Sequence, residues 1–107
     1  MTIDKLSIDI AEMRTNAGQA AELLKAMSNE NRLIILCYLG SQELSVSELN
    51  AYVDLSQSSL SQHLARLRND GLVKTRREKQ TIYYSVANPA VVKLISFLQK
   101  EFCWLWN

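Results

Sequence analysis

The sequence contains few of the residues on which several classes of protein depend. Among its 107 residues are two cysteines, one histidine, one proline and three glycines. Two cysteines cannot build the disulfide framework of a small secreted protein or supply all four ligands of a zinc site within one chain. No apolar run approaches the roughly 18 residues that a membrane span requires, and residues 1–5 lack the basic region and apolar stretch of a signal peptide. We therefore expect a cytoplasmic protein with no metal, no cofactor and no membrane contact.

Motifs of the common enzyme mechanisms are missing as well. The chain has no Cys-x-x-Cys pair and no glycine-rich phosphate loop. Its single histidine, His63, has no carboxylate at a spacing that would orient it for nucleophilic catalysis. The sequence therefore predicts that the protein is not an enzyme.

The charged residues are distributed unevenly along the chain. Residues 1–56 contain four basic and eight acidic side chains, whereas residues 57–80 contain six basic and two acidic ones. A concentrated basic segment beside an acidic remainder is typical of a protein that contacts the phosphates of a nucleic acid. A solvated basic surface without such a partner is the alternative that charge alone leaves open.

Hydrophobic periodicity predicts one mostly helical domain over residues 1–107 with a single β-hairpin. Apolar residues at three- and four-residue spacing indicate the helices, and the β-branched and aromatic residues of 72–86 indicate the hairpin. Ser45 with Glu48 fits a capping box, and Gly40 and Gly71 are placed to end helices. We expect helices at about 9–27, 30–39, 45–52, 56–70 and 88–105, and strands at about 72–77 and 81–86.

The order of these elements is that of a winged helix-turn-helix. Two short helices joined by a tight turn form the helix-turn-helix, and the hairpin that follows them is the wing. In such proteins the second helix of the pair enters the major groove of double-stranded DNA. Leu60, Leu64 and Leu67 form one inward stripe of that helix, which leaves its polar residues for base edges. The basic residues of the helix and the wing are suited to phosphates or the minor groove. The predicted DNA-binding residues are Gln57, Ser58, Ser59, Ser61, Gln62, His63, Arg66, Arg68, Arg76, Arg77 and Lys79.

Two segments of the chain resemble signatures of the ArsR/SmtB family of bacterial repressors. Residues 24–36 read LKAMSNENRLIIL and resemble the second-helix signature of that family. Residues 56–73 read SQSSLSQHLARLRNDGLV and resemble its recognition helix and the exit into its wing. The resemblance covers nearly the whole chain. It implies a winged-helix repressor that leaves its DNA operator on sensing a metal or another chemical signal.

The resemblance also implies how two chains associate. Members of the family form homodimers through their first and last helices, which correspond here to about 9–27 and 88–105. The apolar residues in and after the last helix agree with this, because a monomer of this size would leave them in water. They are Phe97, Phe102, Trp104 and Trp106. A two-fold dimer requires an inverted-repeat operator, because its recognition helices lie about one turn of DNA apart, roughly 34–36 Å.

The segment that holds the metal in the family's metal sensors differs in this chain. Those proteins carry two cysteines in the third helix, whereas residues 43–49 here read ELSVSEL, with Ser45 and Ser47 at both thiolate positions. Hydroxyl groups are poor ligands for the soft metals that thiolates select. A second known site, between paired last helices, uses Asp, His and Glu, of which the last helix here has only Glu101. Metal sensing by either site is therefore disfavoured.

The placement of the two cysteines resembles the HlyU/BigR-type branch of the family, in which a thiol pair responds to oxidants or reactive sulfur species. Cys37 lies in the second predicted helix and Cys103 in the last. The resemblance implies that these residues form a redox switch. Buried structural cysteines are the alternative, and the protein would then bind DNA constitutively or displace a silencer. A winged helix that binds another protein, and not DNA, is a further alternative.

Overall fold

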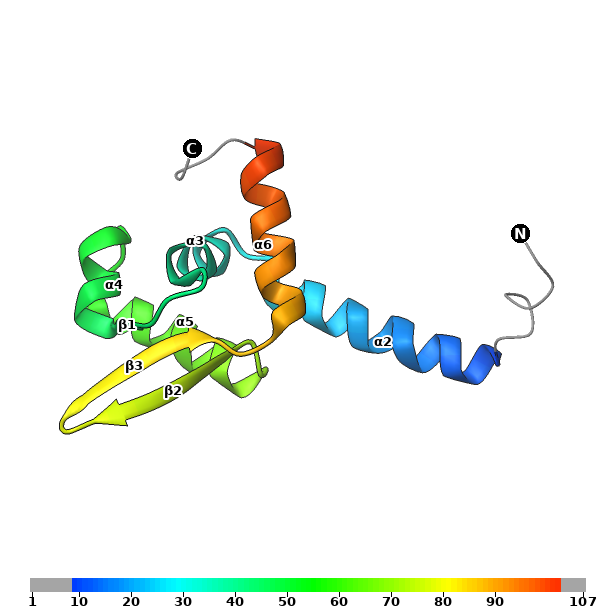
Figure 1. Cartoon of the computed structure of the whole chain (residues 1–107), viewed down its shortest axis with the longest axis horizontal. Coiled ribbons are helices and arrows are strands. Elements are labelled where there is room, and N and C mark those ends of the chain that lie inside the picture. Colours follow the sequence, from blue (N-terminus) through cyan, green and yellow to red (C-terminus); the bar gives the residue numbers. More distant parts are fainter. Residues whose placement is uncertain (1–8, 103–107) are drawn as a thin grey trace.

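The computed structural model describes residues 9–102 of the chain, and Cys103, Trp104 and Trp106 lie outside the described residues. The elements follow the predicted order, with one short strand added (Figure 1). They are α2 (Ile10–Met27), α3 (Glu30–Leu39), β1 (Leu44–Ser45), α4 (Val46–Tyr52), α5 (Gln57–Asn69), β2 (Val73–Glu78), β3 (Thr81–Val86) and α6 (Pro89–Phe102). Helices α4 and α5 form the helix-turn-helix, and β2 and β3 form the wing. The predicted winged helix-turn-helix fold is therefore confirmed.

Local sequence explains where several of the helices begin and end. At the start of α3 the side-chain oxygen of Asn29 accepts a hydrogen bond from a backbone N–H of the first turn (3.1 Å). At the start of α4, Ser45 and Glu48 form the predicted capping box, in which each side chain accepts a bond from the other residue's backbone N–H, at 3.1 and 2.8 Å. Gly40 and Gly71 follow α3 and α5 with φ angles of 50° and 79°, which favour glycine.

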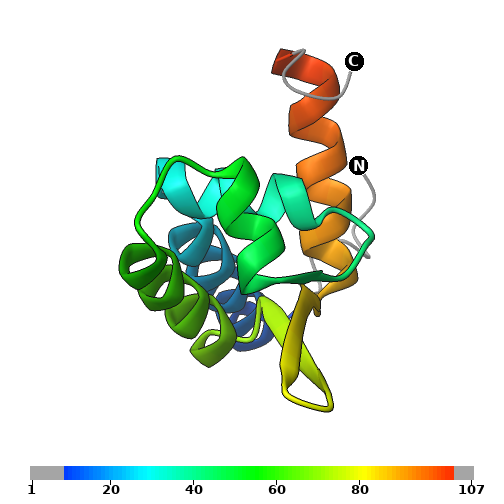
Figure 2. The ribbon, with the colours of Figure 1, turned by 90° about the vertical axis from the view of Figure 1, so that its left-hand side faces the viewer.

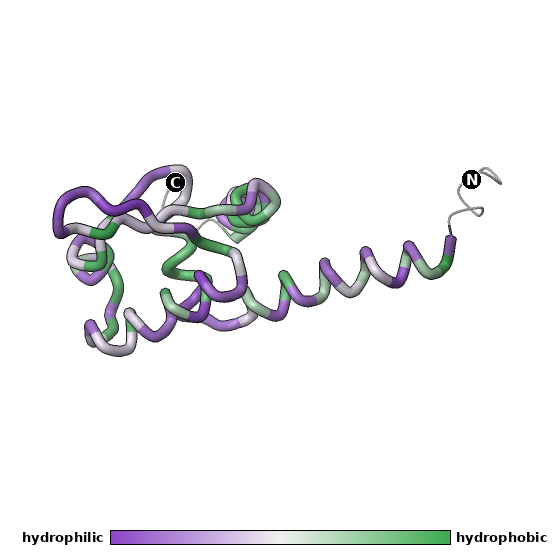
Figure 3. Tube along the Cα trace, turned by 90° about the horizontal axis from the view of Figure 1, so that it is seen from below, coloured by the Kyte–Doolittle hydropathy of each residue, from purple (hydrophilic) through white to green (hydrophobic). Residues whose placement is uncertain are grey.

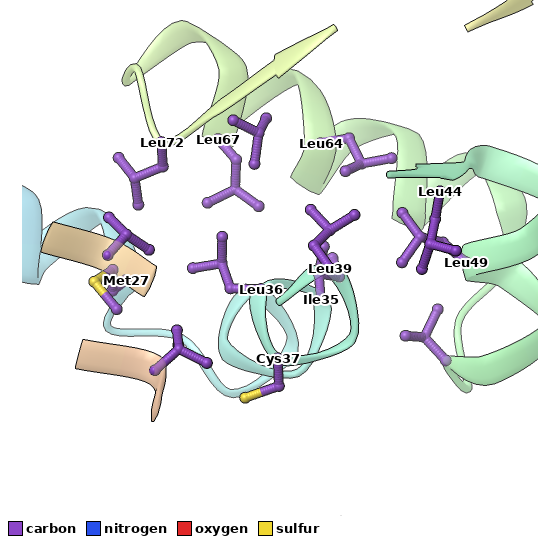
Figure 4. Close-up of a cluster of buried hydrophobic side chains, with 14 of the residues drawn as sticks. Met27, Ile35, Leu36, Cys37, Leu39, Leu44, Leu49, Leu64, Leu67 and Leu72 are labelled. Carbon is purple, nitrogen blue, oxygen red and sulfur yellow. The ribbon is translucent and has the colours of Figure 1, made fainter. Parts of the chain in front are cut away.

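Helix α3 lies at the centre of the molecule and packs against α4, α5, α6 and β3. Its Ile35, Leu36 and Leu39 are fully buried, and the predicted leucine stripe of α5 is buried against them (Figure 4). Burying such a side chain stabilises the fold by about 1.5–3 kcal/mol. This core therefore holds α5 with its opposite face in solvent. The same cluster includes Leu44, Leu49, Leu72, Val91 and Ile95.

Three antiparallel strands form the sheet, in the order β1-β3-β2. The sequence interpretation missed β1, which has two residues and pairs Leu44 with Tyr84 and Ser45 with Tyr83. A strand of this length is too short to show the alternation by which strands are recognised. Because Ser45 also caps α4, β1 connects the wing directly to the first helix of the helix-turn-helix.

Helix α2 extends away from the rest of the molecule, and hydrophobic residues recur along it (Figure 3). Only Ala26 and Met27, in its last turn, are buried. The predicted apolar stripe of this helix faces solvent, with Ile10 75% exposed. On α6, Phe102 is 67% exposed. The two helices expected to form a dimer interface thus present apolar side chains that the core of one chain does not cover.

Candidate nucleic-acid interface

Hydrogen bonds from side chains hold the turn between α4 and α5. The Asn50 amide donates from Nδ2 to the carbonyl oxygen of Leu55 (2.8 Å). The Ser56 hydroxyl accepts a bond from the backbone N–H of Ser59 (3.0 Å) and so caps α5. The buried side chain of Val53 anchors the turn in the core. These contacts, together with the buried leucines, fix the direction in which α5 leaves the turn.

The face of α5 opposite its buried leucines is polar and exposed. Ser58 and Gln62 lie at the middle of this face, because each is two residues from Leu60 and thus about 200° around the helix from it. Both are exposed. These two side chains are the best placed of the predicted base-reading residues.

The remaining predicted polar residues lie at the edges of this face. Gln57 and Ser61 are exposed on one side, and Ser59 and His63 are half-buried on the other. Ser59 donates its backbone N–H to the Ser56 hydroxyl that caps the helix, so this bond comes from the backbone of Ser59 and not from its side chain.

Two exposed residues on the same face were missed by the sequence interpretation. Ala65 and Asn69 lie three and seven residues after Gln62, the spacing that places side chains on one face of a helix. That spacing was the signal for finding them. The exposed face therefore runs the full length of α5, from Ser58 to Asn69.

The basic side chains of α5 lie toward its C-terminal end, next to the wing. The Arg66 guanidinium forms an exposed ion pair with Asp70, with Nε 3.1 Å from Oδ2. Arg68 lines a cavity together with Tyr84 of β3, so it lies at the junction of the recognition helix and the wing. Figure 2 shows α5 and the hairpin on the same side of the molecule, away from the C-terminal end of α6.

The wing ends in a two-residue turn, Lys79-Gln80, between the paired residues Glu78 and Thr81. Lys79 has a φ angle of 59°, which is uncommon for a residue with a side chain. Its side chain and that of Arg77 are exposed, and within residues 9–102 neither forms an ion pair. Both are therefore available to a phosphate.

Arg76 has different surroundings from its neighbour Arg77. Its Nε lies 3.0 Å from both carboxylate oxygens of Glu43, its Nη2 lies 2.9 Å from Oε1 of Glu43, and its Nη1 lies 2.8 Å from Oε1 of Glu78. The guanidinium carbon lies 4.9 Å from the centre of the Tyr83 ring. The hydrogen bonds from Arg76 hold the pKa of the Glu43 carboxyl below its ordinary value, and those to Glu43 and Glu78 raise the pKa of the guanidinium.

Cys37 is buried, with 2% of its surface exposed, and lies on the side of α3 away from α5 (Figure 4). It lines a cavity of about 800 Å³ between α3 and the end of α4. It also lines a second cavity, of about 310 Å³, between α3 and α6. Gln99 borders the second cavity and precedes Cys103 by four residues in the sequence. Because Cys103 lies outside the described residues, the pairing of the two thiols stays a prediction.

The family's metal sensors have a thiolate ligand at the position of Ser45. In this chain the Ser45 side chain caps α4. Within residues 9–102 no three side chains of His, Cys, Asp or Glu come together as metal ligands would. The helices of that part of the chain also include none with the length and hydropathy needed to cross a membrane.

Comparison with known proteins gives consistent matches over most of the chain. Residues 29–75 match the family described as "Bacterial regulatory protein, arsR family". The chain is 51% identical over 96 residues to the transcriptional activator HlyU of Vibrio cholerae, a match that covers 90% of this chain and 89% of that protein.

Two solved structures extend the comparison to the fold. The structure of reduced HlyU from Vibrio cholerae matches with a TM-score of 0.82 and 52% identity, covering 89% of this chain and all of that one. The transcriptional repressor BigR from Xylella fastidiosa matches with a TM-score of 0.79 and 35% identity, covering 92% of this chain and all of that one. These relatives are an activator and a repressor of transcription, and not enzymes.

Proposed function

Because the chain belongs to the ArsR family of bacterial regulatory proteins and is a DNA-binding transcriptional regulator, we propose that it binds an inverted-repeat operator as a homodimer and is switched by its two cysteines. The observation that carries the operator proposal is the exposed polar face of α5 beside the basic wing. Ser58 and Gln62 read base edges, since a hydroxyl can donate or accept and an amide can pair with adenine in two bonds. Arg68, Arg77 and Lys79 hold phosphates and set the register.

The dimer is supported by the apolar side chains that one chain leaves exposed. Ile10 and Met13 on α2, and Phe97 and Phe102 on α6, face solvent in the single chain. Removing such apolar surface from water contributes about 25 cal/mol for each Å², before the entropic costs of association are subtracted. A two-fold arrangement places the two α5 helices against successive major grooves, which explains why the operator would be an inverted repeat.

Selection from a pool of random-sequence duplexes tests the operator and the dimer together. We expect the enriched sequences to contain two inverted half-sites about 10 base pairs apart, centre to centre. Sedimentation at micromolar concentration should give the mass of two chains. A single unrepeated half-site, or a monomer, would contradict the proposal.

Base reading is tested by Gln62→Ala on the selected operator. This change should weaken operator binding by about 1–3 kcal/mol while leaving binding to unrelated duplexes nearly unchanged. The matched control is Gln19→Ala, which removes an exposed glutamine on the side of α2 away from its apolar stripe. Equal losses on both kinds of DNA would mean that Gln62 contacts the backbone and not a base.

The switch is proposed to be a bond between Cys37 and Cys103. Two thiols become a disulfide by losing two protons and two electrons, which a peroxide takes up as it is reduced to water. A persulfide donor reaches the same product in two steps: one thiolate takes the donor's sulfane sulfur and the donor leaves as a thiolate, and the second thiolate then attacks the cysteine sulfur of the new persulfide and displaces hydrosulfide. Both routes need a small reagent at Cys37, and the two cavities that this residue lines support such access.

The consequence of the bond follows from the position of Cys37 on α3. This helix packs against α4 and α5 on one side and against α6 on the other. A bond from α3 to the residue after α6 would change the packing between the DNA-reading helices and a helix of the proposed dimer interface. A 10- to 100-fold loss of operator affinity needs only about 1.4–2.8 kcal/mol of coupling.

The experiment compares wild type, Cys37→Ser and Cys103→Ser before and after treatment with peroxide or a persulfide donor. Wild type should lose operator affinity and regain it with a thiol reductant, and mass spectrometry should find the two cysteines joined. Each variant should bind like reduced wild type under all conditions. A single-cysteine variant that still releases DNA would show that the switch lies elsewhere, and an unresponsive wild type would show that the cysteines are structural.

A further inference from the structure

The wing carries two adjacent arginines whose side chains lie on opposite faces of β2. Residues paired across antiparallel strands share a face, so Arg77 lies with Ile82 and Arg76 with Tyr83. The face of Arg77 continues to the buried Val73, next to α5. The face of Arg76 points the other way. Neighbours in sequence therefore have different surroundings.

Every nitrogen of the Arg76 guanidinium already has a carboxylate partner. Nε and Nη2 bond to Glu43, Nη1 bonds to Glu78, and one face of the group is stacked on the Tyr83 ring. A phosphate would have to share the guanidinium with these two carboxylates, which already neutralise its charge and take an N–H from each of its three nitrogens. Arg77, which forms no ion pair within residues 9–102, has its donors available.

The Glu43–Arg76 ion pair joins β2 of the wing to the segment that leads into α4, and the sheet brings these two parts of the chain together. Arg76 pairs with Tyr83 on β3, and Tyr83 pairs with Ser45 on β1. Glu43 lies two residues before Ser45, which is the residue that caps α4. The Arg76 side chain thus spans the middle strand and binds the segment that begins the helix-turn-helix.

The outer half of the wing buries few side chains against the rest of the molecule. Beyond Thr75, the β2 residues are exposed, as are both residues of the turn and Thr81. Without packing, the direction of a two-stranded hairpin is weakly determined. In the described residues the Glu43–Arg76 pair adds a side-chain contact to the pairing of Ser45 with Tyr83, and together the two contacts tie this half of the wing to the rest of the molecule.

We propose that Arg76 is a positioning residue, which aligns the wing with the helix-turn-helix through Glu43, and that it does not contact a phosphate. This refines the sequence expectation that Arg76 binds DNA, and it rests on the proposed phosphate contacts of Arg77 and Lys79. An exposed ion pair adds little to global stability, so the effect of the pair should be found in the wing and in DNA binding.

Two glutamate substitutions provide a matched comparison. Glu43→Gln and Glu78→Gln each remove one negative charge and one acceptor oxygen next to Arg76, but only the first weakens the link to the helix-turn-helix. The first readout is amide hydrogen exchange of β2 and β3 in the protein without DNA. The second is the affinity for a fluorescein-labelled 30-base-pair duplex of mixed sequence, measured across a potassium chloride series.

We expect Glu43→Gln and Arg76→Ala to speed exchange in the wing and to weaken DNA binding by about threefold to tenfold, with an unchanged salt slope. The double variant should be no weaker than either single one. Glu78→Gln should bind within about twofold of wild type. Arg77→Ala, the control on the opposite face, should lower the slope by about 0.9 for each phosphate that the protein no longer neutralises.

Four results would overturn the proposal. One is tighter binding by Glu43→Gln, because the released guanidinium would then be contacting phosphate. Another is a lower salt slope for Arg76→Ala, like that of Arg77→Ala. The third is unchanged amide exchange in the wing of Glu43→Gln, and the fourth is faster exchange in that variant with unchanged DNA affinity. If wild type shows no salt-dependent binding, the phosphate contacts themselves are wrong, and the exchange measurement still decides whether Glu43 holds the wing.

Discussion

The salt dependence of operator binding is a sharp test of the interface, because ion pairs in the structure separate the basic residues predicted to bind DNA into paired and unpaired ones. Five basic side chains of α5 and the wing were predicted to bind DNA. Two of them already have carboxylate partners: Arg66 is paired with Asp70, and Arg76 with Glu43 and Glu78. Three remain in each chain, and so six in the proposed dimer. They are Arg68, Arg77 and Lys79.

The number of contacts converts directly into a slope. Each phosphate neutralised on duplex DNA contributes about −0.9 to the slope of log affinity against log salt, so six contacts give about −5. Raising the salt from about 50 to about 200 mM should then weaken binding by about 10³-fold. If all five basic residues of each chain contacted phosphate, the slope would be about −9 and the loss about 10⁵-fold. A monomer with three contacts would give a slope of about −3.

Fluorescence anisotropy of the labelled operator at six or more potassium chloride concentrations measures this slope. Arg77→Ala removes one contact from each chain of the dimer and should lower the slope to between about −3 and −4. A wild-type slope near −9 would refute the inference that carboxylate pairing keeps Arg66 and Arg76 from DNA. A slope near zero would refute phosphate binding and favour a winged helix that binds another protein through its apolar faces.

Three further predictions concern the residues that position α4, α5 and the wing. Ser45→Ala breaks the capping box of α4 and should lower the free energy of unfolding by about 1 kcal/mol in urea denaturation. Ser45→Thr should retain most of that stability, because threonine also caps helices. An unchanged free energy of unfolding in Ser45→Ala would mean that the cap does not stabilise the protein. Leu64→Ala, at a fully buried position, should cost about 2–5 kcal/mol in the same assay, and a loss below about 1 kcal/mol would contradict the packing of α5 on α3. In an NMR titration the Glu43 carboxyl should titrate below its ordinary pKa and return to it in Arg76→Ala. Because that pKa is depressed in the folded state, the pair stabilises the protein above the ordinary carboxyl pKa, and this contribution disappears as the pH falls through the lowered one. An equal titration midpoint in both proteins would contradict the ion pair.

The exposed apolar side chains connect the predicted dimer to the structure of the single chain. A chain of this length has one core, and here that core is filled by α3, α5 and the residues packed on them. Most of α2 and one side of α6 receive no cover from it. The sequence analysis expected a monomer to leave apolar side chains of the last helix in water, and the fold shows which side chains of the two helices are exposed in one chain: Ile10 and Met13 on α2, and Phe97 and Phe102 on α6.

Local sequence predicted those features that depend on residues close together in the chain. The leucine stripe of α5 follows from a 3.6-residue period, and the start of α4 from the bond pattern of Ser45 and Glu48. The positive φ angles of Gly40 and Gly71 follow from the ends of the helices they terminate. In each case the interacting groups lie within four or five residues, so the pattern can be read from the order of residues alone.

Tertiary structure decided what depends on contacts between distant residues. The strand β1 exists because two residues pair with β3, far along the chain, and no pattern in Leu44 and Ser45 shows this. Arg76 and Arg77 are the same residue type at adjacent positions, and the sequence analysis assigned both to phosphates or the minor groove. Only the sheet gives Arg76 a partner 33 residues away in Glu43, because the alternation of side chains along a strand turns one arginine toward that carboxylate and the other away from it.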